Sequence, residues 1–185
     1  MHIQTDRTVI EVLGSDGTEL MLNYYIENRE HLAPWEPTRS EEYFTLSNFS
    51  EMLHDNKKSF QDKTALKFSA LNPERNEVIA VCNFTNIVFG PFQACNLGYS
   101  IAEKHQGKGL MSEVLSSTIA YVFEELNLHR IMANYIPENV KSSAVLERLG
   151  FEREGLAKSY LQIAGQWQDH ILTSKLNPKH LAPNK

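Results

Sequence analysis

Cysteine is scarce in this chain, with only Cys82 and Cys95 among 185 residues. Two cysteines exclude a disulfide-rich scaffold, and their apolar, strand-like surroundings predict two reduced, buried thiols rather than a disulfide or a metal pair. Cys82 is therefore not expected to act as a nucleophile. Seven histidines are present, but their spacing matches no metal-ligand pattern, so we expect no metal ion.

Long apolar runs are also lacking. No segment approaches the roughly 18 consecutive apolar residues that a membrane-spanning helix needs. The first seven residues are polar and do not contain the apolar stretch of a secretory signal. Both absences favour a cytoplasmic protein without membrane contact.

Positive charge is in short supply. The chain has 18 Lys and Arg residues against 23 Asp and Glu residues, which gives a formal net charge of −5. The basic residues are scattered along the sequence, so the electrostatic footprint of a sequence-specific nucleic-acid-binding protein is absent. An acidic surface favours a basic substrate only slightly.

What is present is the composition of an ordinary globular protein, with 42% hydrophobic and 22% charged residues. The length suits a single domain that buries a sizeable core. We therefore expect one domain over residues 1–185, with its core at about 7–175. The polar, proline-containing segment 177–185 is expected to be flexible.

The order of predicted elements indicates a mixed α/β domain. Helical spacing of apolar residues predicts two early helices, N-capped by Thr18 and by Ser40, with Pro34 and Pro37 interrupting the chain between them. Short apolar or alternating segments predict strands at 9–13, 66–70, 78–84, 96–101, 130–135, 151–153 and 171–173. A later helix follows helical spacing through 115–126, and a short one runs from Asn139 to 149.

The most informative segment is 97–115, in which an apolar strand leads through a basic, glycine-containing loop into a helix. Glycine allows positive φ and close approach of a ligand to the backbone. The first N–H groups of a helix have no intrahelical acceptor, and the helix dipole adds positive potential there. The segment therefore predicts a diphosphate site built from backbone N–H groups, those of Gln106, Gly107, Lys108, Gly109, Leu110 and Met111.

Three other interpretations of this loop compete with a diphosphate site. A phosphate loop of the Walker type requires a glycine five residues before the Gly-Lys pair and Ser or Thr after the lysine, whereas Gly109 follows Lys108 here. A dinucleotide fingerprint requires a third glycine where Ser112 stands. A plain strand-to-helix turn remains a structural alternative when the loop is considered alone.

Two landmarks in order support the diphosphate site. The pattern of Lys104, Gly107 and Gly109 resembles the acyl-CoA loop of the GNAT acetyltransferase superfamily, although that family usually has Gln or Arg in place of the lysine. The segment NVKSSAVLERLGF at 139–151 resembles its second landmark, the helix beside the pantetheine arm. PWEP at 34–37, NFTNI at 83–87, HRIMANYIPEN at 129–139 and GQWQDH at 165–170 resemble the RimJ branch, so the resemblance covers almost the whole chain.

The resemblance implies a fold and a reaction. It implies a GNAT fold with about seven mostly antiparallel strands, splayed at the centre where strand 96–101 leaves strand 130–135. It implies acetyl-CoA as the donor, bound partly by backbone at Ser100 and Ile101, with Asn139 holding the pantetheine arm, capping its helix, or both. It also implies acetylation of the N-terminal alanine of a small-subunit ribosomal protein, with a possible contact to ribosome assembly.

A protein N-terminus demands little of a general base. An α-amino group with a pKa just below 8 is neutral in roughly a quarter of molecules at pH 7.4, whereas a lysine amine is neutral in about one in a thousand. Glu36 and Asp169 are the candidates to attract the ammonium or accept its proton. The alternative for each is a surface or loop-structuring carboxylate.

The proton that the leaving sulfur needs has a different candidate source. Many GNAT relatives place a tyrosine at the position of Leu146, so the usual acid is missing. The resemblance assigns the proton relay to Ser142, while a helix-capping hydroxyl is the alternative for that serine. We expect the amine to attack the thioester directly in a ternary complex, without an acyl-enzyme.

Two alternative functions stay open from the sequence. One is acetylation of a small amine by the same chemistry. The other is a non-catalytic domain that binds acyl-CoA and serves as a ribosome-assembly or regulatory module.

Overall fold

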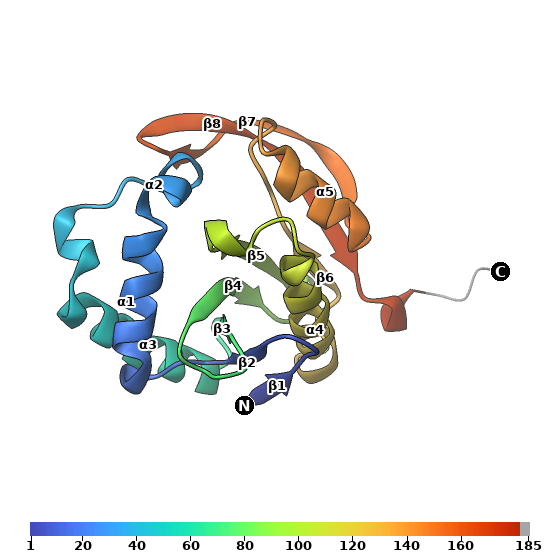
Figure 1. The fold of residues 1–185 in the computed structure, drawn as a ribbon. Helices are drawn as coiled ribbons and strands as arrows, with labels where there is room; N and C mark the ends of the chain where they lie inside the picture. Colours follow the sequence, from blue (N-terminus) through green and yellow to red (C-terminus); the bar gives the residue numbers. More distant parts are fainter. Residues whose placement is uncertain (182–185) are drawn as a thin grey trace.

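An eight-stranded mixed sheet organises the computed structural model, which describes residues 1–181 (Figure 1). The spatial order of its strands is β1-β2-β3-β4-β5-β6-β8-β7, and every neighbouring pair is antiparallel except β5 and β6. The strands are β1 (His2–Gln4), β2 (Val9–Glu11), β3 (Leu66–Leu71), β4 (Val78–Val88), β5 (Ala94–Ile101), β6 (Arg130–Met132), β7 (Glu152–Ile163) and β8 (Gln166–Leu176). The predicted mixed α/β class with a mostly antiparallel sheet is confirmed.

Helices cover both faces of the sheet, and each face has its own apolar core. The helices are α1 (Thr18–Glu27), α2 (Arg29–Leu32), α3 (Leu46–Gln61), α4 (Leu110–Glu125) and α5 (Val140–Arg148). Residues of α1 and α3 pack with Val81 of β4 in one cluster. Residues of α4 and α5 pack with Cys82 of the same strand in the other. Consecutive side chains of β4 therefore serve opposite cores, as the two-residue period of a strand requires.

The sheet opens at its centre, where the site lies. β5 pairs with β6 only from Ala94 to Asn96, opposite Arg130 to Met132. Beyond that point the chain after β6 turns to β8, since the Tyr135 and Ile171 backbones exchange hydrogen bonds of 3.2 and 2.8 Å. The second half of β5 keeps β4 on one side and has no strand on the other within the described residues. The predicted splay between these strands is thus present.

Two helix starts differ from those predicted. Thr18 is the first residue of α1, and its hydroxyl donates to the Ser15 carbonyl at 2.7 Å instead of accepting a cap bond, because a short 3₁₀ turn precedes the helix. Ser40 precedes another 3₁₀ turn, and α3 begins later with Thr45 as its cap, whose hydroxyl accepts from the Asn48 N–H at 3.3 Å. Thr45 caps α3 in place of Ser40 because it directly precedes the first residue of the helix.

The C-terminal part of the fold also differs from expectation. The predicted strand 130–135 ends at Met132, while the predicted strands 151–153 and 171–173 are parts of the much longer β7–β8 hairpin. Asn177 was expected to begin a flexible tail, but it is buried and donates to the Leu128 carbonyl at 2.9 Å. A 3₁₀ turn, Pro178–His180, follows it. The remainder of the predicted tail, 182–185, lies outside the described residues.

None of the helices within residues 1–181 combines the length and the apolar character that crossing a membrane requires.

Candidate functional site

The loop between β5 and α4 has the backbone conformation that an anion site needs. Gly107 and Gly109 have φ values of 72° and 75°, in the left-handed region, and Gly109 is the residue before the first turn of α4. Within residues 1–181, no backbone carbonyl or capping side chain accepts from the N–H groups of 107–111. These five donors and the helix dipole are therefore available to one negatively charged group.

The prediction for this loop was wrong at the Gln106 backbone. Its N–H donates to the Glu103 carbonyl at 3.1 Å, closing a 3₁₀ turn, so it is not free for a ligand. The Gln106 side chain instead contacts both α5 and α2, which lie on opposite sides of the opening in the sheet. Its Oε1 accepts from Lys141 Nζ of α5 at 2.7 Å, and its Nε2 lies 3.0 Å from His31 Nε2 of α2.

The open half of β5 leads from this loop into the middle of the molecule. Ser100 and Ile101, the two backbone positions predicted to bind, lie on this half and pair with β4 on the closed side. The Ser100 hydroxyl is already engaged by the Tyr24 hydroxyl of α1, at 2.8 Å. At Ser100 the backbone, and not the hydroxyl, therefore remains available along this edge.

The start of α5 faces the same opening. Asn139 caps the helix, because its Oδ1 accepts from the Ser142 N–H at 3.0 Å. The Ser142 hydroxyl lies 2.7 Å from the hydroxyl of Tyr99, which projects from β5. Burial raises the pKa of Tyr99 to about 12, so the phenol stays protonated.

Tyr99 is the functional candidate that the sequence interpretation missed. Strand 96–101 was interpreted as a source of backbone groups alone, and the only local signal was a polar-tipped aromatic residue in an otherwise apolar strand. At the position where relatives place an acid, Leu146 is only 1% exposed and belongs to the core. Tyr99 of β5 therefore provides a phenol near the start of α5, whereas α5 itself has leucine at the position of the usual tyrosine.

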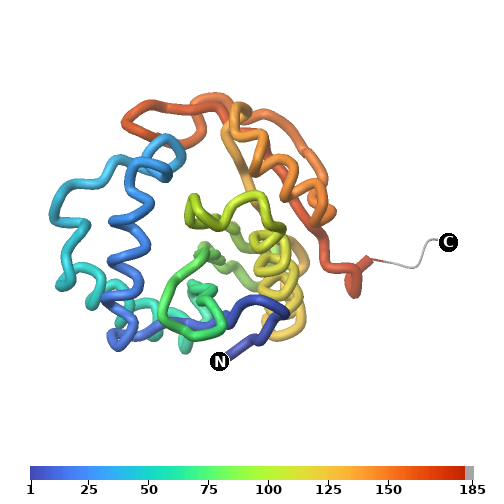
Figure 2. The backbone as a smooth tube through the Cα atoms, viewed as in Figure 1, coloured from blue at the N-terminus to red at the C-terminus, as the bar shows by residue number. Residues whose placement is uncertain are grey.

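The opposite side of the opening is formed by the loop after α2. The Glu36 carbonyl accepts from the Ala164 N–H at 2.9 Å, which ties this loop to the turn between β7 and β8 (Figure 2). The Glu36 side chain is half-buried, and burial raises the pKa of its carboxyl despite the opposing charge of Arg39. Burial also raises the pKa of Tyr24, and the Glu36 carboxylate adds to that rise. Glu36 thus lies near the tyrosine that contacts Ser100.

The structure gives the two carboxylates that the sequence proposed different surroundings. Asp169 lies on β8, and its Oδ1 accepts from the Ser159 N–H at 2.8 Å. Ser159 has a φ of 48° at an irregularity in the β7–β8 pairing, so Asp169 has a clear structural task there. Trp35 and Trp167 are 39% and 65% exposed, so neither side chain belongs to the core.

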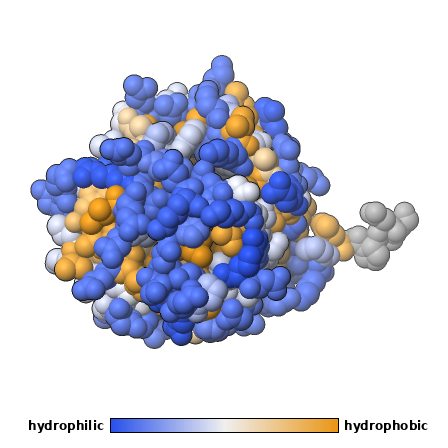
Figure 3. All heavy atoms as spheres, in the orientation of Figure 1, coloured by the Kyte–Doolittle hydropathy of each residue, from blue (hydrophilic) through white to orange (hydrophobic). Residues whose placement is uncertain are grey.

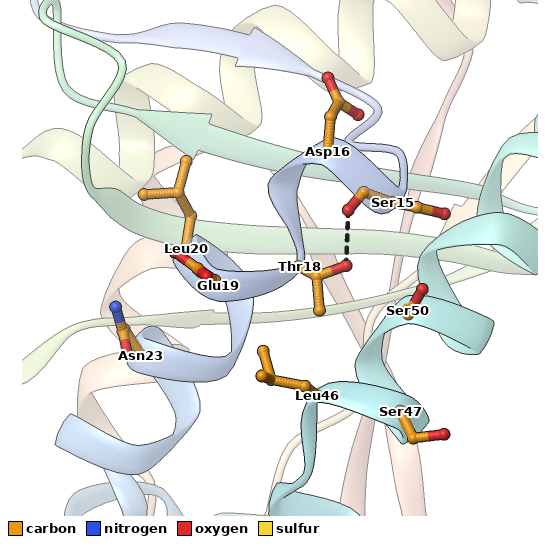
Figure 4. A pocket seen from close by; sticks show the side chains of 9 residues that line it. All are labelled: Ser15, Asp16, Thr18, Glu19, Leu20, Asn23, Leu46, Ser47 and Ser50. Atoms are coloured by element: carbon orange, nitrogen blue, oxygen red, sulfur yellow. Dashed lines mark hydrogen bonds between the residues drawn. The ribbon is translucent and has the colours of Figure 1, made fainter.

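A surface groove elsewhere on the molecule does not suit a diphosphate. It lies between the starts of α1 and α3, encloses about 550 Å³, and its nine lining residues include Asp16 and Glu19 but no basic side chain (Figure 4). Most of the surface visible in Figure 3 is hydrophilic, and apolar atoms gather at the left, over the α1–α3 side. The polar loop at α4 therefore remains the better anion site.

Neither thiol nor any carboxylate cluster offers another chemistry in the described part of the chain. Cys82 and Cys95 are buried, as predicted, and burial raises the pKa of each thiol to about 12. In residues 1–181, no three His, Cys, Asp or Glu side chains converge as metal ligands would.

Comparison with known proteins agrees with this geometry. Residues 11–152 match the family model of the acetyltransferase (GNAT) domain. Over 178 residues the chain is 44% identical to the [ribosomal protein uS5]-alanine N-acetyltransferase of Escherichia coli (strain K12), a match that covers 96% of this chain and 92% of that enzyme.

Solved structures give the same fold. The ribosomal-protein-S5-alanine acetyltransferase from Vibrio fischeri superimposes with a TM-score of 0.93 at 39% identity, covering 98% of this chain and 100% of that one. RimJ from Mycobacterium smegmatis, solved with CoA-disulfide, has a TM-score of 0.87 at 24% identity, covering 95% and 84%. At that identity the second likeness supports the fold alone.

Proposed function

The chain belongs to the GNAT acetyltransferase family, and on that premise we propose that it transfers an acetyl group from acetyl-CoA to the N-terminal α-amine of a protein. The E. coli relative bears the name of a uS5-alanine N-acetyltransferase, and the identity of 44% extends over almost the whole chain. The acceptor proposed here is accordingly the alanine terminus of that small-subunit ribosomal protein. The observation that carries the transfer activity is the set of free loop N–H groups at the end of the open edge of β5.

The residues of the loop fit a CoA diphosphate. Backbone donors of 107–111 have no competing acceptor within the described residues, and a Cβ at Gly107 would meet no atom within 4 Å. Acetyl-CoA supplies the activated acetyl group as a thioester. In our proposal the backbone of Ser100 and Ile101 and the side chain of Asn139 hold the pantetheine arm.

The acceptor amine needs a place that attracts an ammonium and then releases a neutral amine. Glu36 suits the first requirement, because it is a half-buried carboxylate between the tyrosines of α1 and the β7–β8 turn. Its raised pKa makes the carboxylate a better proton acceptor than an exposed one. Asp169 is engaged with the Ser159 backbone, so we assign the amine-binding role to Glu36 and a supporting role in the hairpin to Asp169.

The sulfur side of the reaction is assigned to Ser142. As the amine attacks, a C–N bond forms, the C–S bond breaks, the nitrogen loses a proton and the sulfur gains one. A Ser142 hydroxyl that accepts a hydrogen bond from Tyr99 has its own proton free to point toward the sulfur. Because burial raises the pKa of Tyr99 to about 12, well above that of a thiol, the pair stabilises the leaving sulfur by hydrogen bonding and keeps its own protons. The proton that the nitrogen loses passes to Glu36, and the sulfur takes its proton from solvent.

Closure of the acceptor side supports an N-terminal amine over an internal lysine. The Glu36 loop and the β7–β8 turn are joined through the hydrogen bond between Ala164 and Glu36. An extended chain end can enter beneath such a bridge, whereas a loop that displays a lysine would need the bridge to open. We place the reaction in the cytoplasm, where the ribosomal acceptor is made.

The experiment is release of CoA thiol from acetyl-CoA in the presence of a peptide that begins with the acceptor's alanine. The matched control is the same peptide with its α-amine already blocked but its lysines free. Release with the first peptide alone supports the proposal. Equal release with both peptides would point to lysine as the acceptor, and release only with a polyamine would point to a small amine. Binding of acetyl-CoA without any release would favour a non-catalytic ribosome-assembly module.

A further inference from the structure

Arg7 links the N-terminal strands to the diphosphate loop from more than a hundred residues away. It lies in the turn between β1 and β2, and its Nη1 donates to the Lys108 carbonyl at 2.7 Å. Its Nη2 lies 2.6 Å from Glu113 Oε2 of α4, its Nε donates to the same oxygen at 2.7 Å, and its backbone N–H donates to Oε1 at 3.0 Å. Three guanidinium contacts and one backbone contact therefore fix Arg7 against the loop and the first turn of α4.

The bond to Lys108 fixes the direction of a free donor. In a planar trans peptide, the carbonyl of one residue and the N–H of the next point in opposite directions. Holding the Lys108 carbonyl toward Arg7 therefore directs the Gly109 N–H to the other side of the loop. That N–H has no acceptor within the described residues, so it is held ready for a ligand.

The ion pair with Glu113 removes a charge of the wrong sign. Glu113 is the one acidic residue in the first turn of α4, close to the free N–H groups. Burial alone would raise its pKa, but hydrogen bonds from Thr5 and Arg7 hold the pKa below its usual value, so the side chain is a carboxylate. An unpaired carboxylate there would repel a diphosphate and oppose the positive end of the helix dipole.

We propose that Arg7 is a positioning residue of the acetyl-CoA site, which aims the Gly109 N–H through the Lys108 carbonyl and neutralises Glu113. This inference rests on the proposed use of acetyl-CoA. It assigns the N-terminal turn a part in binding the donor, although the turn lies outside the matched family domain of residues 11–152.

The test is the CoA dissociation constant of four proteins, measured by calorimetry: wild type, Arg7→Ala, Glu113→Gln and the double variant. Arg7→Ala should weaken CoA binding about tenfold or more, and Glu113→Gln alone should change it by less than about threefold. Adding Glu113→Gln to Arg7→Ala should recover a large part of the loss, because the uncompensated charge is then gone. The KM for the acceptor peptide should stay unchanged in all four.

A closely matched control is Arg75, which lies in the turn between β3 and β4. Arg75 forms a fork with Glu11 of β2, with Nη2 contacts of 2.9 and 2.7 Å. The side-chain exposures are 52% and 16% for that pair, against 48% and 18% for Arg7 and Glu113. Arg75→Ala should therefore lower the melting temperature about as much as Arg7→Ala while leaving CoA affinity at the wild-type value.

The outcomes separate this inference from the proposed function. Normal CoA binding by Arg7→Ala would overturn the inference alone. A double variant that binds as weakly as Arg7→Ala would overturn the part of the inference that concerns the charge of Glu113. Failure of the wild-type protein to bind CoA would overturn the proposed function as well.

Discussion

Replacing Gly107 with leucine tests the diphosphate site most directly. Gly107 has a φ of 72°, and a Cβ placed there would meet no protein atom within 4 Å. The fold should therefore lose only the cost of a left-handed leucine, about 1–2 kcal/mol. For a chain of this size that corresponds to a melting temperature lower by about 2–8 °C.

The effect on ligand binding should be much larger. The new side chain enters the space in front of the free N–H groups, and a hydrogen bond to a charged group is worth about 1.5–3 kcal/mol. Loss of two such bonds would cost about 3–6 kcal/mol, which weakens CoA binding by a factor of about 100 or more. Isothermal calorimetry measures the affinity, and thermal denaturation measures the stability.

Gly90 provides the matched control for this substitution. It lies between β4 and β5 with a φ of 77°, and its Cβ would also meet nothing within 4 Å. Gly90→Leu should thus lower the melting temperature by a similar amount and leave CoA affinity unchanged. Equal affinity of the Gly107 and Gly90 variants for CoA would refute the assignment of the anion site to this loop.

Three further substitutions test the chemistry and the core. Tyr99→Phe removes the hydroxyl that holds Ser142, so kcat should fall about tenfold while both KM values stay near wild type; a kcat like that of wild type in steady-state assays would contradict the role of the pair. Burial raises the folded-state pKa of Glu36, so its contribution to stability is present below the unfolded pKa and is lost as pH rises through the folded pKa. The melting temperature of Glu36→Gln relative to wild type should accordingly be higher at pH 7 than at pH 4, and the variant should raise the KM of the acceptor. Equal differences in melting temperature at the two pH values would argue against a raised pKa. Leu146→Tyr restores the residue of other relatives at a position only 1% exposed, so it should destabilise the fold by about 1–3 kcal/mol without raising kcat, as denaturant unfolding and kinetics can show.

Local chemistry explains which parts of the site the sequence could predict. Positive φ at Gly107 and Gly109, and the cap that Asn139 provides for α5, depend on residues within a few positions of one another. Such features can be predicted because backbone sterics and helix capping act at short range. The splay of β5 from β6 was predicted through family resemblance, since no local pattern specifies which strand edge stays free.

Contacts between distant segments explain most of what was missed. Tyr99 and Ser142 are 43 positions apart, and Arg7 and Glu113 are 106 apart, so only the folded topology brings them together. The long β7–β8 hairpin was underestimated because most of β7 is exposed, which removes the apolar alternation that identifies a half-buried strand. Ser40 has the chemistry of a helix cap, but Thr45 is the residue that caps α3.

The two buried thiols determine how this enzyme can be followed in solution. Cys82 and Cys95 are 0% exposed and are the whole thiol content of the chain. Native protein should therefore not react with a thiol-reactive dye. The colour that develops during the reaction then measures the CoA thiol released, one thiol for each turnover. A slow colour change without any donor present would instead report the moment at which the fold opens.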